Sequence, residues 1–234
     1  MGRISQLAKE HKYIVAMAPA ESYMDPSTPE FSLSLGFNHK EWEGLAPGFN
    51  YRGRNIYAAL LAKYGKTIVG SESTGTKDTT EAIDTSVTID TVESIDTFDF
   101  ITIQLYEGYS HAKYRIDEQG DTAAQTILEL VQALQTGWEV QFEGVPSLGI
   151  PNQVVKIHST RVVIGLANAW AGDGKFLLIY PEEMEKVHGA LVENGVRPKG
   201  YAYWNMKDED IASETRPGDR VNMAKGLNAF LKIR

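Results

Sequence analysis

Polar side chains stand at the end of a strongly apolar segment in the middle of the chain. Residues 98–106 alternate in character, and a strand of this sequence places Ile101, Ile103 and Leu105 on one face. Gln104 and Tyr106 then lie on the other face, toward the carboxyl end of the strand. An amide and a phenol at this position could hydrogen-bond a ligand. The structural alternative is a polar pair that is satisfied within the core.

Two further segments carry candidate contact residues. Trp204 ends the apolar residues 200–204, and its flat indole could form a floor under a sugar ring. The turn at residues 19–26 follows another apolar segment and places Glu21 and Asp25 on the same rim. A core tryptophan and a solvated loop are the structural alternatives for these two segments.

Four short apolar segments alternate with helical patterns along the chain. Strands are expected at residues 13–18, 98–106, 161–167 and 200–204, and helices at 54–64, 121–135, 181–194 and 218–231. Strict alternation predicts a parallel sheet whose strands are neighbours in chain order, with the helices packed outside. Such an α/β sheet is either doubly wound or part of a (β/α)8 barrel. In both architectures ligands bind at the carboxyl ends of the strands, where the candidate residues stand.

The pattern is typical of a single domain over residues 1–234, with two irregular insertions. Residues 71–97 are rich in Thr and Asp and repeat Ile-Asp-Thr, and we expect a surface excursion that includes a β-hairpin. The second insertion is expected near residues 138–159. Residues 4–11 resemble the last turns of an amphipathic helix, which suggests that further sequence lies upstream.

The N-terminal residues are polar and charged, which is not the pattern of a signal peptide. No apolar run reaches the length of a membrane span. The sequence therefore leaves the localisation open, and secretion would require a leader upstream of Met1.

Composition disfavours several classes of partner and site. The 31 acidic and 23 basic residues give a net charge of -8, which disfavours binding to nucleic acid and to anionic membranes. The absence of cysteine excludes disulfides and thiolate sites. The five histidines show no paired spacing, and neither a Walker loop nor a Gly-x-Gly-x-x-Gly loop is present. We therefore expect neither a metal nor a cofactor.

Four segments in order resemble the C-terminal half of family-18 glycoside hydrolases, the chitinase and chitinase-like group. They are "AMAPAESYMDP", "FDFITIQLYEGY", "VVIGLANAWAGDGKFLLIYPEEM" and "GYAYWNMKDED". The resemblance implies a TIM-type (β/α)8 barrel of which this chain holds about four βα units, corresponding to barrel strands five to eight. It also implies chitin or a chitooligosaccharide as the ligand.

The resemblance assigns roles to the candidate residues. It makes Tyr106 the phenol that hydrogen-bonds the acetamido group of the substrate, Gln104 a neighbouring floor residue and Trp204 the indole beneath the reacting sugar. Glu107 stands where plant-type members commonly have Asn, and Glu21 is displaced by one position from a common Pro-Glu pair. Both glutamates are expected to contact the sugar.

One departure from the family decides the expected activity. The catalytic motif Asp-x-x-Asp-x-Asp-x-Glu is absent, and the nearest acidic cluster, at residues 90–99, has the wrong spacing. In the family the acetamido oxygen attacks the anomeric carbon while a Glu protonates the leaving oxygen. The chain alone is therefore expected to bind oligosaccharide weakly without hydrolysing it.

Three functions stay open, and one physical property follows from the half-barrel interpretation. The functions are a chitinase-like hydrolase domain, a non-catalytic chitinase-like lectin or interaction protein, and an unrelated α/β domain that binds a small molecule. A half barrel leaves two open sheet edges and a bare inner face, so we expect self-association or marginal stability.

Overall fold

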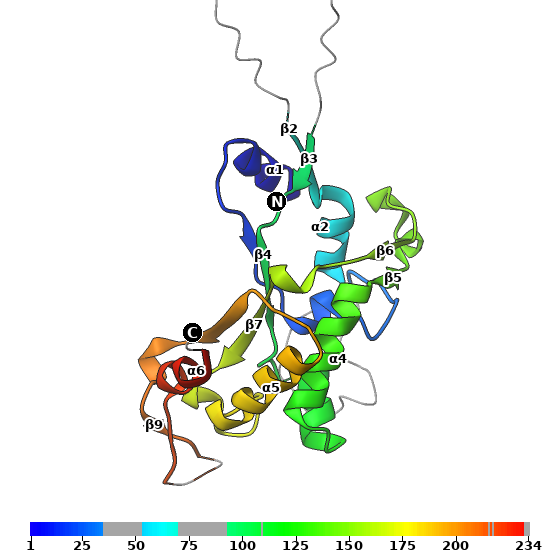
Figure 1. The fold of residues 1–234 in the computed structure, drawn as a ribbon. Coiled ribbons are helices and arrows are strands. Elements are labelled where there is room, and N and C mark those ends of the chain that lie inside the picture. The colour runs from blue at the N-terminus through cyan, green and yellow to red at the C-terminus, as the bar shows by residue number, and fades with distance from the viewer. Residues whose placement is uncertain (35–52, 70–92, 109, 215, 217, 232–234) are drawn as a thin grey trace, which may run out of the picture.

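A sheet of four parallel strands forms the centre of the molecule in a computed structural model (Figure 1). The structure describes residues 1–34, 53–69, 93–108, 110–214, 216 and 218–231. The strands are β1 (Ala16–Met17), β4 (Phe100–Gln104), β7 (Val162–Ala167) and β8 (Gly200–Trp204). They are neighbours in that order, and each pairing is parallel. The predicted strand order and direction are confirmed, and the chain has a mixed α/β fold.

Helices follow the sequence pattern closely. They are α1 (Gly2–Glu10), α2 (Ile56–Tyr64), α3 (His111–Lys113), α4 (Ala123–Thr136), α5 (Pro181–Glu193) and α6 (Met223–Leu231). The hydroxyl of Thr122 caps α4 by accepting a hydrogen bond from the backbone N–H of Gln125 at 3.1 Å. Gly137, with φ of 93°, ends the same helix because an L side chain rarely adopts this conformation. Pro181 occupies the first position of α5, where its missing N–H has no cost.

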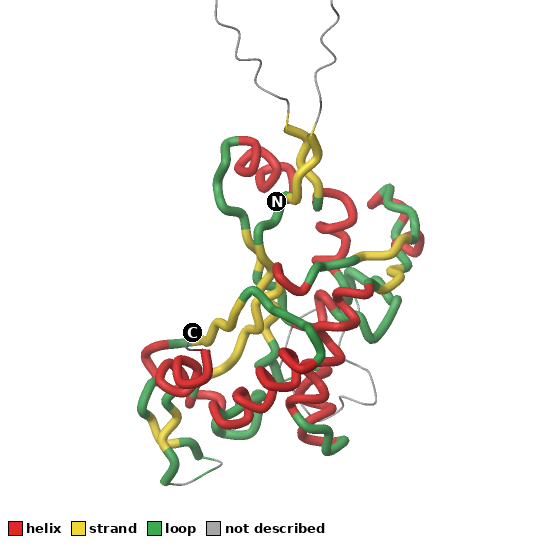
Figure 2. The backbone as a smooth tube through the Cα atoms, viewed as in Figure 1, coloured by secondary structure: helices red, strands yellow, loops and turns green. Residues whose placement is uncertain are grey.

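The apolar core lies between the sheet and these helices. Ile101, Ile103 and Ile164 on the sheet are fully or almost fully buried. They belong to the same apolar cluster as the stripes Ile127, Val131 and Leu134 of α4 and Met184, Val187 and Leu191 of α5. Complete burial of each such side chain contributes roughly 1.5–3 kcal/mol. Figure 2 shows the strands of the sheet in the middle of the molecule and the helices around them.

The opposite side of the sheet forms a second face, which we call the inner face. Strand register places Thr102 beside Val163, Gln104 beside Gly165, and Gly165 beside Ala202. The inner face consists of Ile14, Ala16, Ala18, Phe100, Thr102, Gln104, Val163, Gly165, Ala202 and Trp204. Apart from Gly165, these residues are exposed or half-buried.

Short antiparallel strand pairs occur in the second insertion and beside the described end of the first. β2 (Lys66–Val69) pairs antiparallel with β3 (Glu93–Asp96), which agrees with a hairpin at its ends; residues 70–92 lie outside the described residues. In the second insertion β5 (Trp138–Val140) pairs antiparallel with β6 (Gln153–Val155). Phe142 follows β5 and is fully buried, so this segment contributes to the core instead of looping over the surface.

Two helix boundaries differ from the expectation. The last helix begins at Met223 and not at residue 218, because β10 (Arg220–Val221) pairs antiparallel with β9 (Ile211–Ala212). At the other end, α1 already begins at Gly2, which packs so closely against Tyr64 that a Cβ atom would lie 2.1 Å from its ring. Within the described residues, no helix is both long and apolar enough to cross a membrane.

Candidate functional site

A concavity of about 400 Å³ opens at the carboxyl end of the inner face. It is lined by Ala18, Thr102, Gln104, Tyr106, Gly165, Leu166, Ala202, Tyr203 and Trp204. The structure therefore brings Gln104, Tyr106 and Trp204 together from two different strands. They meet because parallel strands present their carboxyl ends at one edge of the sheet.

Tyr106 and Gln104 form a hydrogen-bonded pair inside the concavity. The Tyr106 hydroxyl donates to the side-chain oxygen Oε1 of Gln104, and the Gln104 amide nitrogen donates to the backbone carbonyl of Ala18. The amide is thus held from both ends, which orients it along the floor of the concavity. A ligand carbonyl that accepted the phenol proton would have to compete with Gln104.

Trp204 lies on the solvent side of the sheet and not in the layer between sheet and helices. Its side chain is 64% exposed. Phe230 of α6 instead packs on the outward-facing Tyr201, with ring centroids 6.1 Å apart. The alternation along β8 explains the difference, since Tyr201 and Trp204 are three residues apart and face opposite sides. The exposed indole is available to a ligand.

The backbone at Trp204 is held by residues that follow β7. The backbone N–H of Asn168 donates to the Trp204 carbonyl at 3.0 Å, and its side-chain amide donates to the Asn205 carbonyl at 2.8 Å. The indole N–H of Trp170 also donates to the Trp204 carbonyl. The loop after β7 therefore positions the end of β8.

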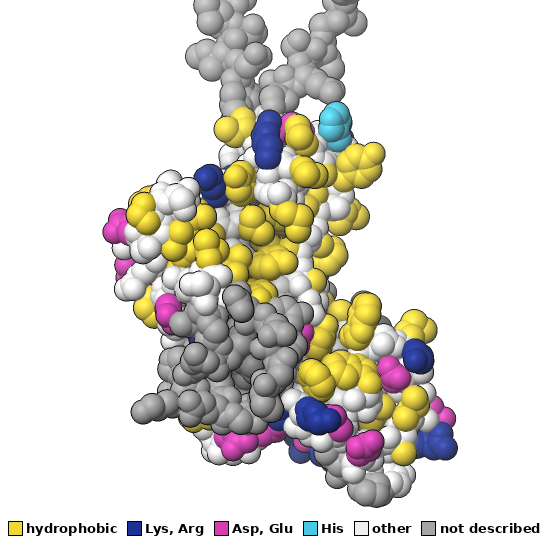
Figure 3. Space-filling view, turned by 180° about the vertical axis from the view of Figure 1, so that it is seen from behind, with side chains coloured by type: hydrophobic (Ala, Val, Ile, Leu, Met, Phe, Trp, Pro, Cys, Tyr) yellow, Lys and Arg dark blue, Asp and Glu magenta, His cyan; other side chains and the backbone are white. Residues whose placement is uncertain are grey.

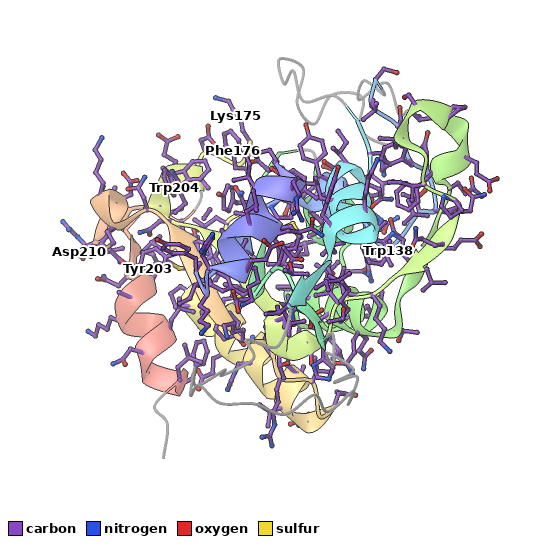
Figure 4. All side chains as sticks on the ribbon, turned by 90° about the horizontal axis from the view of Figure 1, so that it is seen from above. Trp138, Lys175, Phe176, Tyr203, Trp204 and Asp210 are labelled. Atoms are coloured by element: carbon purple, nitrogen blue, oxygen red, sulfur yellow. The ribbon has the colours of Figure 1, made fainter. Side chains whose placement is uncertain are left out.

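Trp170 links this loop to the site, and the sequence reasoning missed it. Its ring packs edge-on against Tyr106, with centroids 5.8 Å apart, and against Phe176, with centroids 5.0 Å apart. Figure 4 shows Phe176 and Trp204 on the same side of the molecule, far from Trp138. The sequence feature that could have identified Trp170 is its position just after the strand at residues 161–167, because parallel sheets bind ligands at the carboxyl ends of their strands.

The two glutamates expected at the site do not line the concavity. Glu107 follows Tyr106 directly and is buried, and burial raises the pKa of its carboxyl group. Glu21 follows Ala20, which bridges to Gln104, and begins a short 3-10 helix, Glu21–Met24, in which the Glu21 side chain is buried. Neither glutamate is among the residues that line the concavity, so their predicted contact with the sugar has no support from the geometry of this site.

Glu21 instead takes part in a buried polar cluster between the segment that follows β1 and helix α3. Its carboxylate oxygen Oε2 accepts a hydrogen bond from the backbone N–H of Ala112 at 2.9 Å. Burial, followed by the nearby charge of Asp25, raises the pKa of Glu21 to about 8. Glu21 and Asp25 line a separate cavity of about 200 Å³ together with His111 and Arg115. Asp25 itself is paired with Arg54 at 3.0 Å.

The described lining of the concavity contains no carboxyl group. None of the described residues that line it carries a charge. The described part of the acidic cluster, residues 93–99, lies before β4, at the opposite end of the sheet. There Asp96 pairs with Arg161 at 2.7 Å and with Lys66 at 2.8 Å. Among the described residues, no group of three His, Asp or Glu side chains is placed to hold a metal ion.

No protein-family model and no curated protein matches the chain. The function must therefore be inferred from the chemistry of the concavity. Aromatic and apolar walls with a few oriented polar groups are typical of sites for uncharged small ligands. A carbohydrate has this chemistry, because its rings offer apolar faces and hydrogen-bonding edges.

Proposed function

We propose that the chain binds β-1,4-linked N-acetylglucosamine oligomers in the concavity and does not hydrolyse them. In this proposal it is the C-terminal half of a chitinase-like (β/α)8 domain. The convergence of Gln104, Tyr106 and Trp204 on one concavity is the observation that carries the proposal.

The strand order supports the barrel interpretation over a doubly wound sheet. In a doubly wound sheet the ligand binds where the strand order reverses. Here the order β1-β4-β7-β8 follows the chain without a reversal. The concavity lies instead at the carboxyl ends of successive strands, as in the barrel family of folds.

The exposed indole supports a sugar as the ligand. A sugar ring stacked on Trp204 would remove apolar surface from water, and covering about 100 Å² would contribute roughly 2.5 kcal/mol. The amide of Gln104 and the phenol of Tyr106 lie beside it and can hydrogen-bond the amide of an acetamido group. An N-acetylated sugar therefore uses both features of the site.

The expectation that the chain does not hydrolyse the sugar rests on the residues around the concavity. General-acid assistance is worth roughly 10²- to 10⁴-fold in rate. Glu21 and Glu107 lie close in the sequence to the lining residues Ala18 and Tyr106. Both glutamates are buried, and neither lines the concavity. Tyr106 alone cannot replace an acid of this kind.

Calorimetric titration with chitotetraose tests the proposal. Cellotetraose is the matched ligand, since it has the same linkage and lacks the acetamido groups. We expect weak binding of chitotetraose, weaker binding of cellotetraose and loss of both with Trp204→Ala. Tyr13→Ala is the control variant, because Tyr13 is 67% exposed before β1, away from the concavity. No binding of chitotetraose, or an equal loss in the control, would contradict the proposal.

A non-catalytic lectin or interaction protein is the second candidate. The uncharged lining of the concavity favours it, because a lectin needs no acid. The two candidates predict different activities for a longer protein that contains this chain. A chitinase would hydrolyse chitooligosaccharides, whereas a lectin would bind them with no release of shorter products.

A further inference from the structure

We propose that two copies of this chain close on each other into an eight-stranded parallel barrel. In this dimer β8 of each copy pairs with β1 of the other. The inference rests on the sheet and on the half-barrel interpretation proposed above, but not on the ligand. An experiment can therefore contradict the proposed dimer without contradicting the proposed sugar binding, and the reverse.

The exposed inner face is the first argument. Parallel sheets occur almost only with both faces covered. Here the helices cover one face, while Ile14 is 79% exposed and Trp204 is 64% exposed on the other. Seen from behind Figure 1, hydrophobic side chains gather on the upper part of the described surface, above and beside the residues drawn in grey (Figure 3). A face of this kind in a parallel sheet is expected to be covered in the working protein.

The two edges of the sheet are the second argument. β1 and β8 are the outer strands, and neither has a second strand partner among the described residues. Open edges of a sheet are templates for pairing with another chain. Because all four strands are parallel, an added strand on either edge continues the sheet in the same direction.

Symmetry identifies a second copy as the occupant. A two-fold axis along the centre of the barrel places β8 of each copy beside β1 of the other, so both junctions are identical. All strands remain parallel, and two sheets of four make the eight strands whose side chains just fill a barrel. The two identical junctions together therefore remove both open edges of each four-stranded sheet.

Charge is compatible with this contact. Each chain has a net charge of -8. None of the residues that form the inner face is charged, although the Lys199 amino group lies 6.0 Å from the centroid of the Phe100 ring. The concavities of the two copies would face each other across one mouth, and each copy would contribute a Trp204 to it.

Sedimentation velocity over a range of protein concentrations tests the stoichiometry without any ligand. We expect a discrete dimer. Ile14→Asp places a charge on the inner face and should shift the chain to monomer. Val192→Asp is the control, since Val192 is 53% exposed on α5 and should leave the dimer intact. Monomer throughout, an open series of larger species, or equal effects of the two variants would overturn the proposal.

Cysteine cross-linking tests the junction itself, and the chain has no native cysteine. Ala16→Cys marks β1 and Ala202→Cys marks β8. Within one chain these strands are three spacings apart, about 14 Å, so a short bis-maleimide should not join them. We expect covalent dimers when the two single variants are mixed, and none from either variant alone. A dimer in sedimentation that gives no cross-link in the mixture would overturn the arrangement.

Discussion

The hydroxyl of Tyr106 donates a hydrogen bond to the side-chain oxygen of Gln104, two residues earlier on the same face of the sheet. This pair lies in the floor of the concavity and is held to the neighbouring strand through the Ala18 carbonyl. The polar part of the site is thus oriented before any ligand binds. Such orientation lowers the conformational cost of binding.

Tyr106→Phe removes the phenol oxygen and keeps the ring. We expect the fold to survive and chitotetraose binding to weaken by about 3- to 10-fold, since one hydrogen bond of roughly 0.5–1.5 kcal/mol is lost. Calorimetric titration and a thermal melt measure the two effects. In a full-length hydrolase the same change should lower turnover. Unchanged affinity would remove the Tyr106 hydroxyl from the site.

Trp170→Leu should weaken sugar binding although Trp170 does not line the concavity. The change removes the hydrogen bond to the Trp204 carbonyl and the ring contact with Tyr106. Trp170→Phe keeps an aromatic ring and should lose less affinity than Trp170→Leu. Phe176→Leu is a comparison that leaves the hydrogen bond in place. Titration with chitotetraose gives the ranking, and equal affinities for all variants would contradict a positioning role.

Ile103→Ala should destabilise the chain strongly. Ile103 is almost fully buried between the sheet and the helices, and large-to-small changes at such sites cost about 2–5 kcal/mol. Ile14→Ala is the matched control, because Ile14 is exposed on the other side of the sheet. Urea unfolding measures both free energies. A small loss at Ile103, or an equal loss at Ile14, would show that the helices do not pack on this face.

The protonation of Glu21 should make stability depend on pH. Its pKa in the folded chain is about 8, above the ordinary value of 4.5, so the folded chain holds a proton that the unfolded chain releases. The free energy of unfolding should therefore fall between pH 4.5 and 8, by at most about 1.4 kcal/mol per pH unit, and change little from this group above pH 8.

Glu21→Gln tests this dependence, because the amide oxygen can still accept from Ala112 but cannot ionise. Urea unfolding at several pH values should show that the variant gains stability over the native chain as the pH rises from 5 to 8. Glu139→Gln, on an exposed side chain, should follow the native profile. Parallel profiles for native chain and Glu21→Gln would show that Glu21 is ionised in the fold.

The isolated chain should release no product from chitooligosaccharides. The reason is that no described residue lining the concavity carries a carboxyl group. Chromatography of chitohexaose after long incubation measures this directly. Hydrolysis that disappears with Glu107→Gln or Glu21→Gln would identify one of these buried glutamates as the missing acid.

Local pattern was sufficient for the elements and for part of the site. Residue alternation places Gln104 and Tyr106 on one face, and the alternation of strands and helices predicts the parallel order that the structure has. Both alternations are patterns of residues close together in the chain, so they can be read from the sequence. Because ligands bind at the carboxyl ends of the strands in parallel α/β folds, the sequence also predicted that residues at the ends of β4 and β8 line one site.

Only the tertiary structure decided which residues are buried opposite one another. Trp138 and Phe142 contribute to the core through a pair of short strands, although their segment has no clear periodicity. Glu21 is buried against the N–H of Ala112, a residue distant in the sequence. Trp170 contacts Tyr106 from a different strand-to-helix loop. Each of these contacts joins distant parts of the chain, and a pattern within one segment reports which side a residue faces but not what lies there.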